Sequence, residues 1–185
     1  HSFPTRRSSV LIHVRKPLFS QRELKIYLEQ FPVACYHRII VHTHHSLAKI
    51  YGLGGIHFNK RNPLPAVNDE QYNILRLSCS VHSLKELGEV RIQLTSAFVS
   101  PVFESISKPG YPANEEFKGL RDFYKHHHNA PKAIALGGIT EHNIETAAQL
   151  GFSGVAVLGT LWRNAESTEV LNMYKLLQKQ CVQLS

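Results

Sequence analysis

Short apolar runs alternate with longer segments of helical spacing from residue 10 onward. Seven runs have the length and composition of buried strands, and they cover residues 10–14, 38–42, 55–58, 74–80, 92–99, 132–136 and 154–158. The segments between them have the amphipathic spacing of helices that cover a sheet. The pattern therefore predicts repeated strand–helix units around a parallel sheet.

Cap-forming residues mark the expected starts of the intervening helices. The predicted N-caps are Ser20, Ser83, Asn114 and Thr140. Gly52 and Gly151 lie where two helices should end, because glycine readily takes the left-handed conformation found at helix C-termini. The apolar spacing of residues 166–184 predicts a further, outer helix.

The number of strand–helix units fits either an open doubly wound sheet or a barrel. No Gly-x-Gly-x-x-Gly sequence follows the first run, so a dinucleotide-binding open sheet is disfavoured. We therefore predict an α/β fold, a (β/α)8 TIM barrel that lacks its first strand–helix unit.

The first nine residues, "HSFPTRRSS", have no strand or helix pattern and read like a translated sequencing adapter. We expect residues 1–9 to be a non-native segment and residues 10–185 to be one truncated TIM-barrel domain. A missing unit would leave two strands without a neighbour, and unpaired strand edges favour aggregation. We therefore expect that this chain can be inactive even where its parent is an enzyme.

Composition indicates a soluble domain, since 43% of the 185 residues are hydrophobic and 19% are charged. The net charge of +7 comes from basic residues spread along the chain, so we expect no nucleic-acid partner. No apolar run reaches membrane-spanning length, and we expect no membrane association. Three scattered cysteines suit a reducing compartment, which predicts a cytoplasmic protein. The oligomeric state stays open.

In a barrel the reactive groups lie at the carboxyl ends of the strands, so the polar residues after each run are the candidate site. They are Arg15 and Lys16 after the first run, Lys60 and Arg61 after the third, Ser80 and His82 after the fourth, and Ser105, Ser107 and Lys108 after the fifth. The positive charge of the arginines and lysines among them predicts a substrate with several negative charges. The alternative is that Lys60 and Arg61 are ordinary solvent-exposed residues with no part in the site.

Two glycines, Gly137 and Gly138, separate the sixth run from the next helix. Such a loop can direct backbone N–H groups at an anion, and Gly159 and Thr160 after the last run would face it. Phosphate binding by the last two such loops is common in barrels. The alternative is that the glycines only make a tight turn.

Histidine occurs 12 times, with clusters at residues 42–45 and 126–128. Strand alternation would put His42 and His44 on one face, where they could bind a metal, but no third ligand has a suitable spacing. We therefore predict no metal site from these residues. The second cluster is expected at a surface helix end.

Six segments in this order resemble the thiamine-phosphate synthases and the related thiazole tautomerases: "HVRKP", "GIHFN", "SCSVHS", "SPVFESISKPG", "ALGGIT" and "GVAVLGTLW". The resemblance implies a (β/α)8 barrel and a transferase of thiamine biosynthesis. Such a synthase couples hydroxymethylpyrimidine diphosphate to thiazole phosphate and releases pyrophosphate. The implied partners are small phosphorylated substrates, and Mg²⁺ is the implied cofactor.

The resemblance also assigns roles to the candidate residues. It implies catalytic roles for Arg15 at the diphosphate, Ser80 near the reacting centre and Lys108 at the pyrophosphate. The implied substrate-binding residues are Lys16, His82, Ser105, Ser107, Gly137, Gly138, Gly159 and Thr160. The proline-rich segment would then stiffen a loop whose hydroxyls and lysine contact phosphate oxygens.

The chain departs from the synthase pattern at three positions. A family lysine matches Pro17, and the two magnesium-binding aspartates match Thr43 and Asn62. Magnesium sites usually contain a carboxylate, so the expected Mg²⁺ site lacks its ligands. One hypothesis is that a lysine or arginine, Lys16, Lys60 or Arg61, supplies the missing positive charge.

Two alternatives to the synthase remain open. A thiazole tautomerase needs a proton carrier; a family histidine matches Pro101, so His82 would have to serve, unless His82 only caps the next helix. A non-catalytic protein that binds thiazole phosphate or thiamine phosphate would need the phosphate-binding loops alone. Retention of Arg15, Ser80 and Lys108 favours the synthase.

Overall fold

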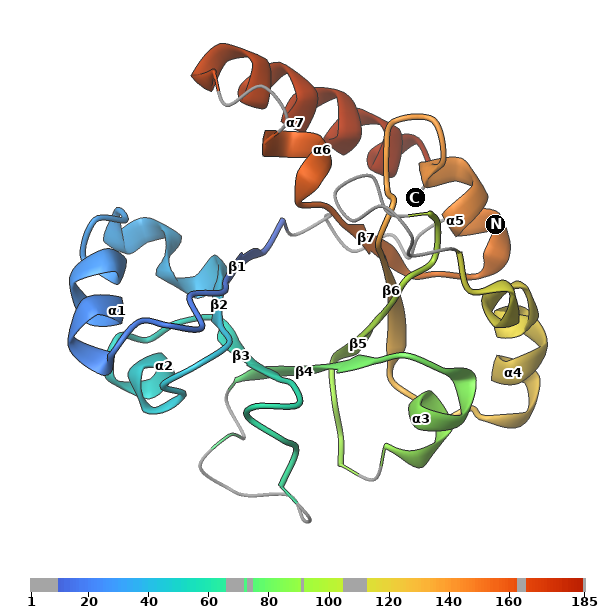
Figure 1. The fold of residues 1–185 in the computed structure, drawn as a ribbon, viewed down its shortest axis with the longest axis horizontal. Coiled ribbons are helices and arrows are strands. Elements are labelled where there is room, and N and C mark those ends of the chain that lie inside the picture. The colour runs from blue at the N-terminus through green and yellow to red at the C-terminus, as the bar shows by residue number, and fades with distance from the viewer. Residues whose placement is uncertain are drawn as a thin grey trace. The chain divides into compact units, whose positions relative to one another are not determined.

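The computed structural model describes residues 10–65, 72, 75–90, 92–104, 113–162 and 166–184. The chain is an α/β protein of parallel strands connected by helices (Figure 1). It divides into two compact units, whose described parts are residues 10–80 with 92–95, the N-terminal unit, and residues 81–90 with 96–184, the C-terminal unit. That residues 10–185 together form one barrel domain stays a prediction.

The N-terminal unit contains parallel strands with helical connections. Its strands are β1 (Ile12–Val14), β2 (Ile39–Val41), β3 (Gly55–Phe58) and β4 (Arg76–Val81), the last residue of which begins the C-terminal unit. Its helices are α1 (Gln21–Leu28), the 3-10 helix η1 (Val33–Arg38) and α2 (Ser46–Ile50). Every residue of β2 and β3 is buried, as expected of strands covered on both faces.

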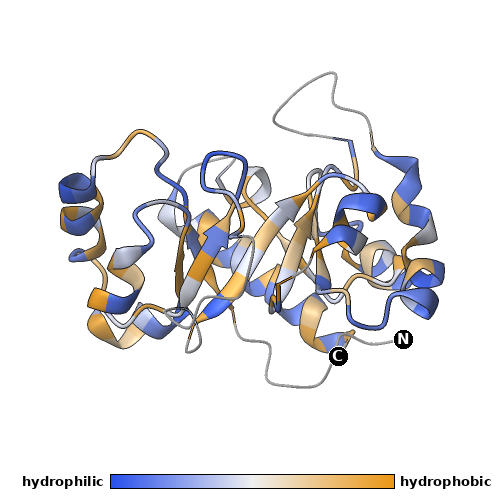
Figure 2. Cartoon of the chain, turned by 90° about the horizontal axis from the view of Figure 1, so that it is seen from below, coloured by the Kyte–Doolittle hydropathy of each residue, from blue (hydrophilic) through white to orange (hydrophobic). Residues whose placement is uncertain are grey.

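The C-terminal unit also contains a parallel sheet, in the order β5-β6-β7. Its strands are β5 (Ser96–Val99), β6 (Lys132–Leu136) and β7 (Gly154–Ala156). Its helices are α3 (Leu84–Glu89), the 3-10 helix η3 (Glu115–Gly119), α4 (Leu120–His126), α5 (Ile144–Leu150), α6 (Gly159–Trp162) and α7 (Ser167–Gln183). Figure 2 shows hydrophobic residues along the strands and mixed hydropathy on the helices, the distribution expected of strands under amphipathic helices.

Local capping chemistry sets the start of three helical segments where the sequence predicted them. The Ser20 hydroxyl accepts the Glu23 N–H at 3.3 Å, and the Ser20 N–H donates to the Glu23 carboxylate at 2.8 Å, a capping box at α1. Ser83 caps α3, and Asn114 caps η3. At the other end of α5, Gly151 has the predicted left-handed conformation, with φ of 100°.

The predicted cap at Thr140 is wrong, because α5 begins three residues later, at Ile144. The Asn143 side chain explains the delay: its oxygen accepts the Thr140 N–H at 2.9 Å, and its amide donates to the Gly138 carbonyl at 2.8 Å. These two bonds hold residues 140–143 in a turn that competes with helix formation.

The expected C-terminal helix is present as α7, which packs against α5 and α6. Leu177 is buried, whereas Leu171 and Leu176 are exposed. None of the helices in the described part of the chain is both long enough and apolar enough to cross a membrane.

Candidate functional site

Three histidines and two serines meet at adjacent strands of the N-terminal unit. His13 Nδ1 lies 3.1 Å from His42 Nε2, and the His42 ring stacks on the His57 ring with centroids 4.2 Å apart. The two nitrogens of His57 contact the Ser78 hydroxyl at 2.9 Å and the Ser80 hydroxyl at 2.8 Å. These five residues, the histidine–serine cluster, form a continuous polar network.

The register of the parallel strands produces this cluster. Val41 of β2 pairs with Ile56 of β3, so the next residues along each strand, His42 and His57, lie side by side. His57 in turn pairs with Ser78 of β4. His42, His57 and Ser78 lie at the same level of neighbouring parallel strands, and their side chains therefore come together.

Burial keeps all three imidazoles neutral. It lowers the pKa of His13 to about 4. The pKa of His42 falls to about 3 and that of His57 to about 2, because of burial first and then of repulsion from neighbouring imidazoles and from Arg15. At neutral pH each ring therefore has one nitrogen that can accept a hydrogen bond or bind a metal.

Two predicted catalytic residues belong to this neighbourhood. The Ser80 hydroxyl contacts His57, and the exposed Arg15 lies close enough to lower the pKa of both His42 and His57. The structure thus brings Arg15 and Ser80, 65 positions apart in the sequence, to one network.

Lys16, a predicted substrate-binding residue, contacts aromatic rings. Its ammonium lies 4.8 Å from the centroid of Tyr27 and 5.4 Å from that of Phe19. Because a cation over two ring faces is held electrostatically, Lys16 is anchored on the α1 side of the first loop.

The sequence-based pairing of His42 with His44 is wrong. β2 ends at Val41, so strand alternation does not continue through residues 42–44. His44 has φ of 51°, and its Nε2 contacts the Phe19 carbonyl at 2.8 Å. The partners of His42 are instead His13 and His57. The sequence did contain a signal for this cluster, since each of the first three apolar runs contains one of these three histidines.

The residues at the family's magnesium-binding positions do not fit Mg²⁺. The Thr43 hydroxyl is buried and has no hydrogen-bond partner in the described part of the chain, and the Asn62 amide donates to the His42 carbonyl at 3.1 Å. Within the described residues, the only group of three or more potential ligands from histidine, cysteine and carboxylate side chains consists of the three histidines. Mg²⁺ prefers carboxylate and water oxygens, so this donor set does not suit it.

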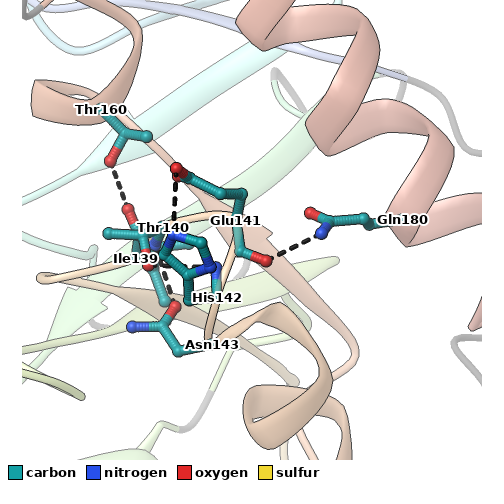
Figure 3. Close-up of polar contacts among 7 residues, drawn as sticks. All are labelled: Ile139, Thr140, Glu141, His142, Asn143, Thr160 and Gln180. Carbon is teal, nitrogen blue, oxygen red and sulfur yellow. Dashed lines mark hydrogen bonds and ion pairs between the residues drawn. The ribbon is translucent and has the colours of Figure 1, made fainter.

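The predicted phosphate-binding loops of the C-terminal unit lie next to each other. The buried Thr160 hydroxyl donates a hydrogen bond to the Ile139 carbonyl, which joins the start of α6 to the loop after β6 (Figure 3). Gly159 is the first residue of α6. On the other side, the Gln180 amide of α7 donates to the Glu141 carbonyl at 2.7 Å.

Both loop glycines have a structural function of their own. Gly137 and Gly138 have φ of 94° and 63°. A Cβ at Gly138 would lie 2.3 Å from the Glu104 carbonyl oxygen, so only glycine allows this approach of the β5 and β6 loops. The tight-turn explanation therefore accounts for these glycines, and anion binding stays a prediction.

His82 contacts the end of β5 and does not cap α3. Its Nδ1 lies 2.9 Å from the Ser100 carbonyl oxygen, whereas the side-chain cap of α3 is Ser83. The other predicted residues of the fifth loop, Ser105, Ser107 and Lys108, lie outside the described residues.

Comparisons with known proteins agree on one family. A family model described as thiamine monophosphate synthase matches residues 7–161. The thiamine-phosphate synthase of Lysinibacillus sphaericus (strain C3-41) is 29% identical over 162 residues, covering 82% of this chain and 74% of that protein. A thiamine phosphate pyrophosphorylase from Bacteroides thetaiotaomicron has 26% identity and a TM-score of 0.73, covering 97% of this chain and 87% of that one.

The thiamine phosphate pyrophosphorylase from Pyrococcus furiosus has a similar fold at lower identity. It is 18% identical with a TM-score of 0.74, and the match covers 96% of this chain and 85% of that one. At this level of identity the likeness shows the fold alone.

Proposed function

Because this chain belongs to the thiamine monophosphate synthase family, we propose that it couples hydroxymethylpyrimidine diphosphate to thiazole phosphate. It is a thiamine-phosphate synthase-like enzyme, a transferase. The observation that carries the specific reaction is the proximity of Arg15 and Ser80 to one buried imidazole network, because a cation and an oriented hydroxyl suit a diphosphate leaving group. We also propose that the parallel strands belong to a (β/α)8 barrel.

In the proposed reaction, the bond between the pyrimidine methylene carbon and the diphosphate oxygen breaks. Pyrophosphate leaves with the electron pair, and the thiazole nitrogen forms the new carbon–nitrogen bond. Negative charge grows on the leaving oxygens, where the Arg15 guanidinium would stabilise it. His57 would hold the Ser80 hydroxyl toward the reacting centre, and Lys108 would contact the pyrophosphate.

Protein cations supply the charge that Mg²⁺ would provide in this proposal. Thr43 and Asn62 offer a hydroxyl and an amide where the family pattern has aspartates. Lys60 and Arg61 are exposed after β3, and either could approach a diphosphate; Lys16 would have to leave its aromatic contacts first. The proposed enzyme is therefore independent of Mg²⁺.

The thiazole phosphate would bind at the loops after β6 and β7. The hydrogen bond between Thr160 and the Ile139 carbonyl holds these loops together, which supports a single binding site formed by Gly137, Gly138 and Gly159. Ser105 and Ser107 would add hydroxyl groups from the fifth loop.

The test is to incubate the chain with both substrates and detect thiamine phosphate by mass spectrometry. We expect product only when both substrates are present. Thiazole-phosphate binding without any product would reject the transferase and favour a non-catalytic binding protein. Isomerisation of a thiazole precursor, without coupling, would favour a tautomerase.

A further inference from the structure

The histidine–serine cluster contains more nitrogen donors than the proposed transfer reaction uses. One ligand atom from each of His13, His42 and His57 can be chosen so that all three lie within 4.8 Å of one another. His42 and His57 are buried, with exposed fractions of 7% and 1%, and His13 is half-buried. Three converging imidazoles from three successive strands are an unusual arrangement for a protein interior, where histidine is mostly at least partly exposed.

The spacing of these atoms is close to that of a zinc site. Zinc binds imidazole nitrogen at about 2.0–2.1 Å, so two nitrogens of a tetrahedral site lie about 3.3 Å apart. His13 Nδ1 and His42 Nε2 are already 3.1 Å apart. The His57 ring lies beside this pair, stacked on His42, and its ligand atom lies within 4.8 Å of the other two, so it has to move and turn toward the common centre to complete the site.

The chemistry of the donors selects the metal. Neutral imidazole suits Zn²⁺, Co²⁺, Ni²⁺ and Cu²⁺, whereas Mg²⁺ prefers oxygen ligands. Each of the three side chains offers one nitrogen ligand atom, so the donor set is all nitrogen.

Groups around the cluster can orient its ligands. His57 has a serine hydroxyl at each ring nitrogen, so one nitrogen can leave Ser80 or Ser78 for the metal while the other keeps its serine. The Asn62 amide holds the backbone of His42 through its carbonyl at 3.1 Å. Such outer contacts fix ring orientation in metal sites.

We propose that His13, His42 and His57 form a three-histidine binding site for a divalent transition-metal ion, with Zn²⁺ as the expected occupant. Three protein ligands leave the fourth tetrahedral position for water or for an oxygen of a small ligand. The proposal concerns binding and does not depend on the proposed transferase activity.

Zinc retention by the intact chain tests this proposal. The chain is stripped with a chelating resin and dialysed against micromolar ZnSO4, and bound zinc is measured by atomic spectrometry. We expect one Zn²⁺ per chain. His13→Gln, at the half-buried position, should weaken zinc binding by more than the roughly 10- to 100-fold typical of losing an outer-shell partner, and His42→Asn should do the same. The matched control is His126→Ala/His128→Ala, which removes two exposed histidines of the surface cluster and should leave retention unchanged.

Cobalt gives a readout that needs no variant. Co²⁺ bound in a tetrahedral histidine site absorbs visible light far more strongly than hydrated Co²⁺, so the wild-type chain should develop this absorption and lose it when Zn²⁺ is added. Millimolar Mg²⁺ should have no effect. The proposal is overturned if the wild-type chain gives no such absorption, or if zinc retention is lost in His126→Ala/His128→Ala and kept in His13→Gln. Turnover plays no part in either readout, so failure here leaves the proposed function untouched.

Discussion

Buried neutral histidines make the N-terminal unit sensitive to acid. Burial first, and then repulsion from the neighbouring rings and Arg15, disfavours a positive charge at His42, which is why its pKa falls to about 3. In the unfolded chain the same imidazole takes up a proton near pH 6.5. The unfolded state therefore binds more protons than the folded state below pH 6.5, and stability falls as the pH falls.

We expect the chain to be less stable at pH 5 than at pH 7.5 in metal-free buffer, with His42 alone accounting for about 2 kcal/mol of the loss. His42→Asn removes that proton uptake, so its free energy of unfolding should depend less steeply on pH. Urea unfolding at the two pH values measures this. His128→Asn, at an exposed position, should keep the wild-type dependence, and an equal dependence in His42→Asn would contradict the account.

Arg15 is the residue expected to stabilise the leaving diphosphate. Arg15→Ala should lower kcat/KM for thiamine phosphate formation by about 100- to 1000-fold, the usual effect of removing a donor that stabilises transition-state charge. Arg15→Lys should recover part of the loss, since it keeps the charge and loses the planar fork. The control is Arg22→Ala on the exposed face of α1. Equal rates for Arg15→Ala and Arg22→Ala would remove Arg15 from the mechanism.

At the scale of elements, the contact between the β5 and β6 loops depends on Gly138. Gly52 has almost the same φ as Gly138, 61° against 63°, but a Cβ there would meet nothing within 4 Å. Comparing substitutions at the two positions therefore separates the free-energy cost of a positive φ from the cost of a steric overlap at a close approach.

Gly52→Ala should cost about 1 kcal/mol, from the left-handed backbone alone. Gly138→Ala should cost at least about 2 kcal/mol more, because its Cβ would overlap the Glu104 carbonyl oxygen and force the loops apart. Chemical denaturation of both variants measures the difference. Equal costs would mean that the β5 and β6 loops do not need this contact.

The loops after β6 and β7 are joined by one buried hydroxyl. Thr160→Val keeps the shape of the side chain but leaves the Ile139 carbonyl without its donor, which should cost about 1–3 kcal/mol of stability. If these loops bind thiazole phosphate, KM for that substrate should also rise. Thr168→Val, at an exposed position of α7, is the matched control and should change neither quantity.

The sequence predicts helix ends, which depend on nearby residues, better than it predicts which side chains meet across paired strands. The caps Ser20 and Ser83 and the C-terminal Gly151 were predictable, because each depends on residues within one helical turn. The meeting of His13 with His57 was not, because it depends on strand pairing between positions 44 residues apart. The Thr140 cap failed where Asn143 offered a competing local partner.

For the molecule as a whole, family membership supports the proposed transferase, whereas the residues at the expected metal positions do not suit Mg²⁺. The family model spans residues 7–161, which covers the N-terminal unit and the C-terminal unit as far as residue 161. Thr43 and Asn62 cannot supply the carboxylates that Mg²⁺ requires. Turnover should therefore not increase when Mg²⁺ is raised from zero to millimolar concentration, and a strong Mg²⁺ requirement would contradict the proposed role of the protein cations.

The stoichiometry of a single reaction tests directly whether the chain is a thiamine-phosphate synthase. The chain is supplied with hydroxymethylpyrimidine diphosphate and thiazole phosphate in Mg²⁺-free buffer, and thiamine phosphate and pyrophosphate are quantified together over time. We expect thiamine phosphate and pyrophosphate to appear in equal amounts, and only in the presence of both substrates. Pyrophosphate without thiamine phosphate, or neither product from a folded chain that binds thiazole phosphate, would contradict it.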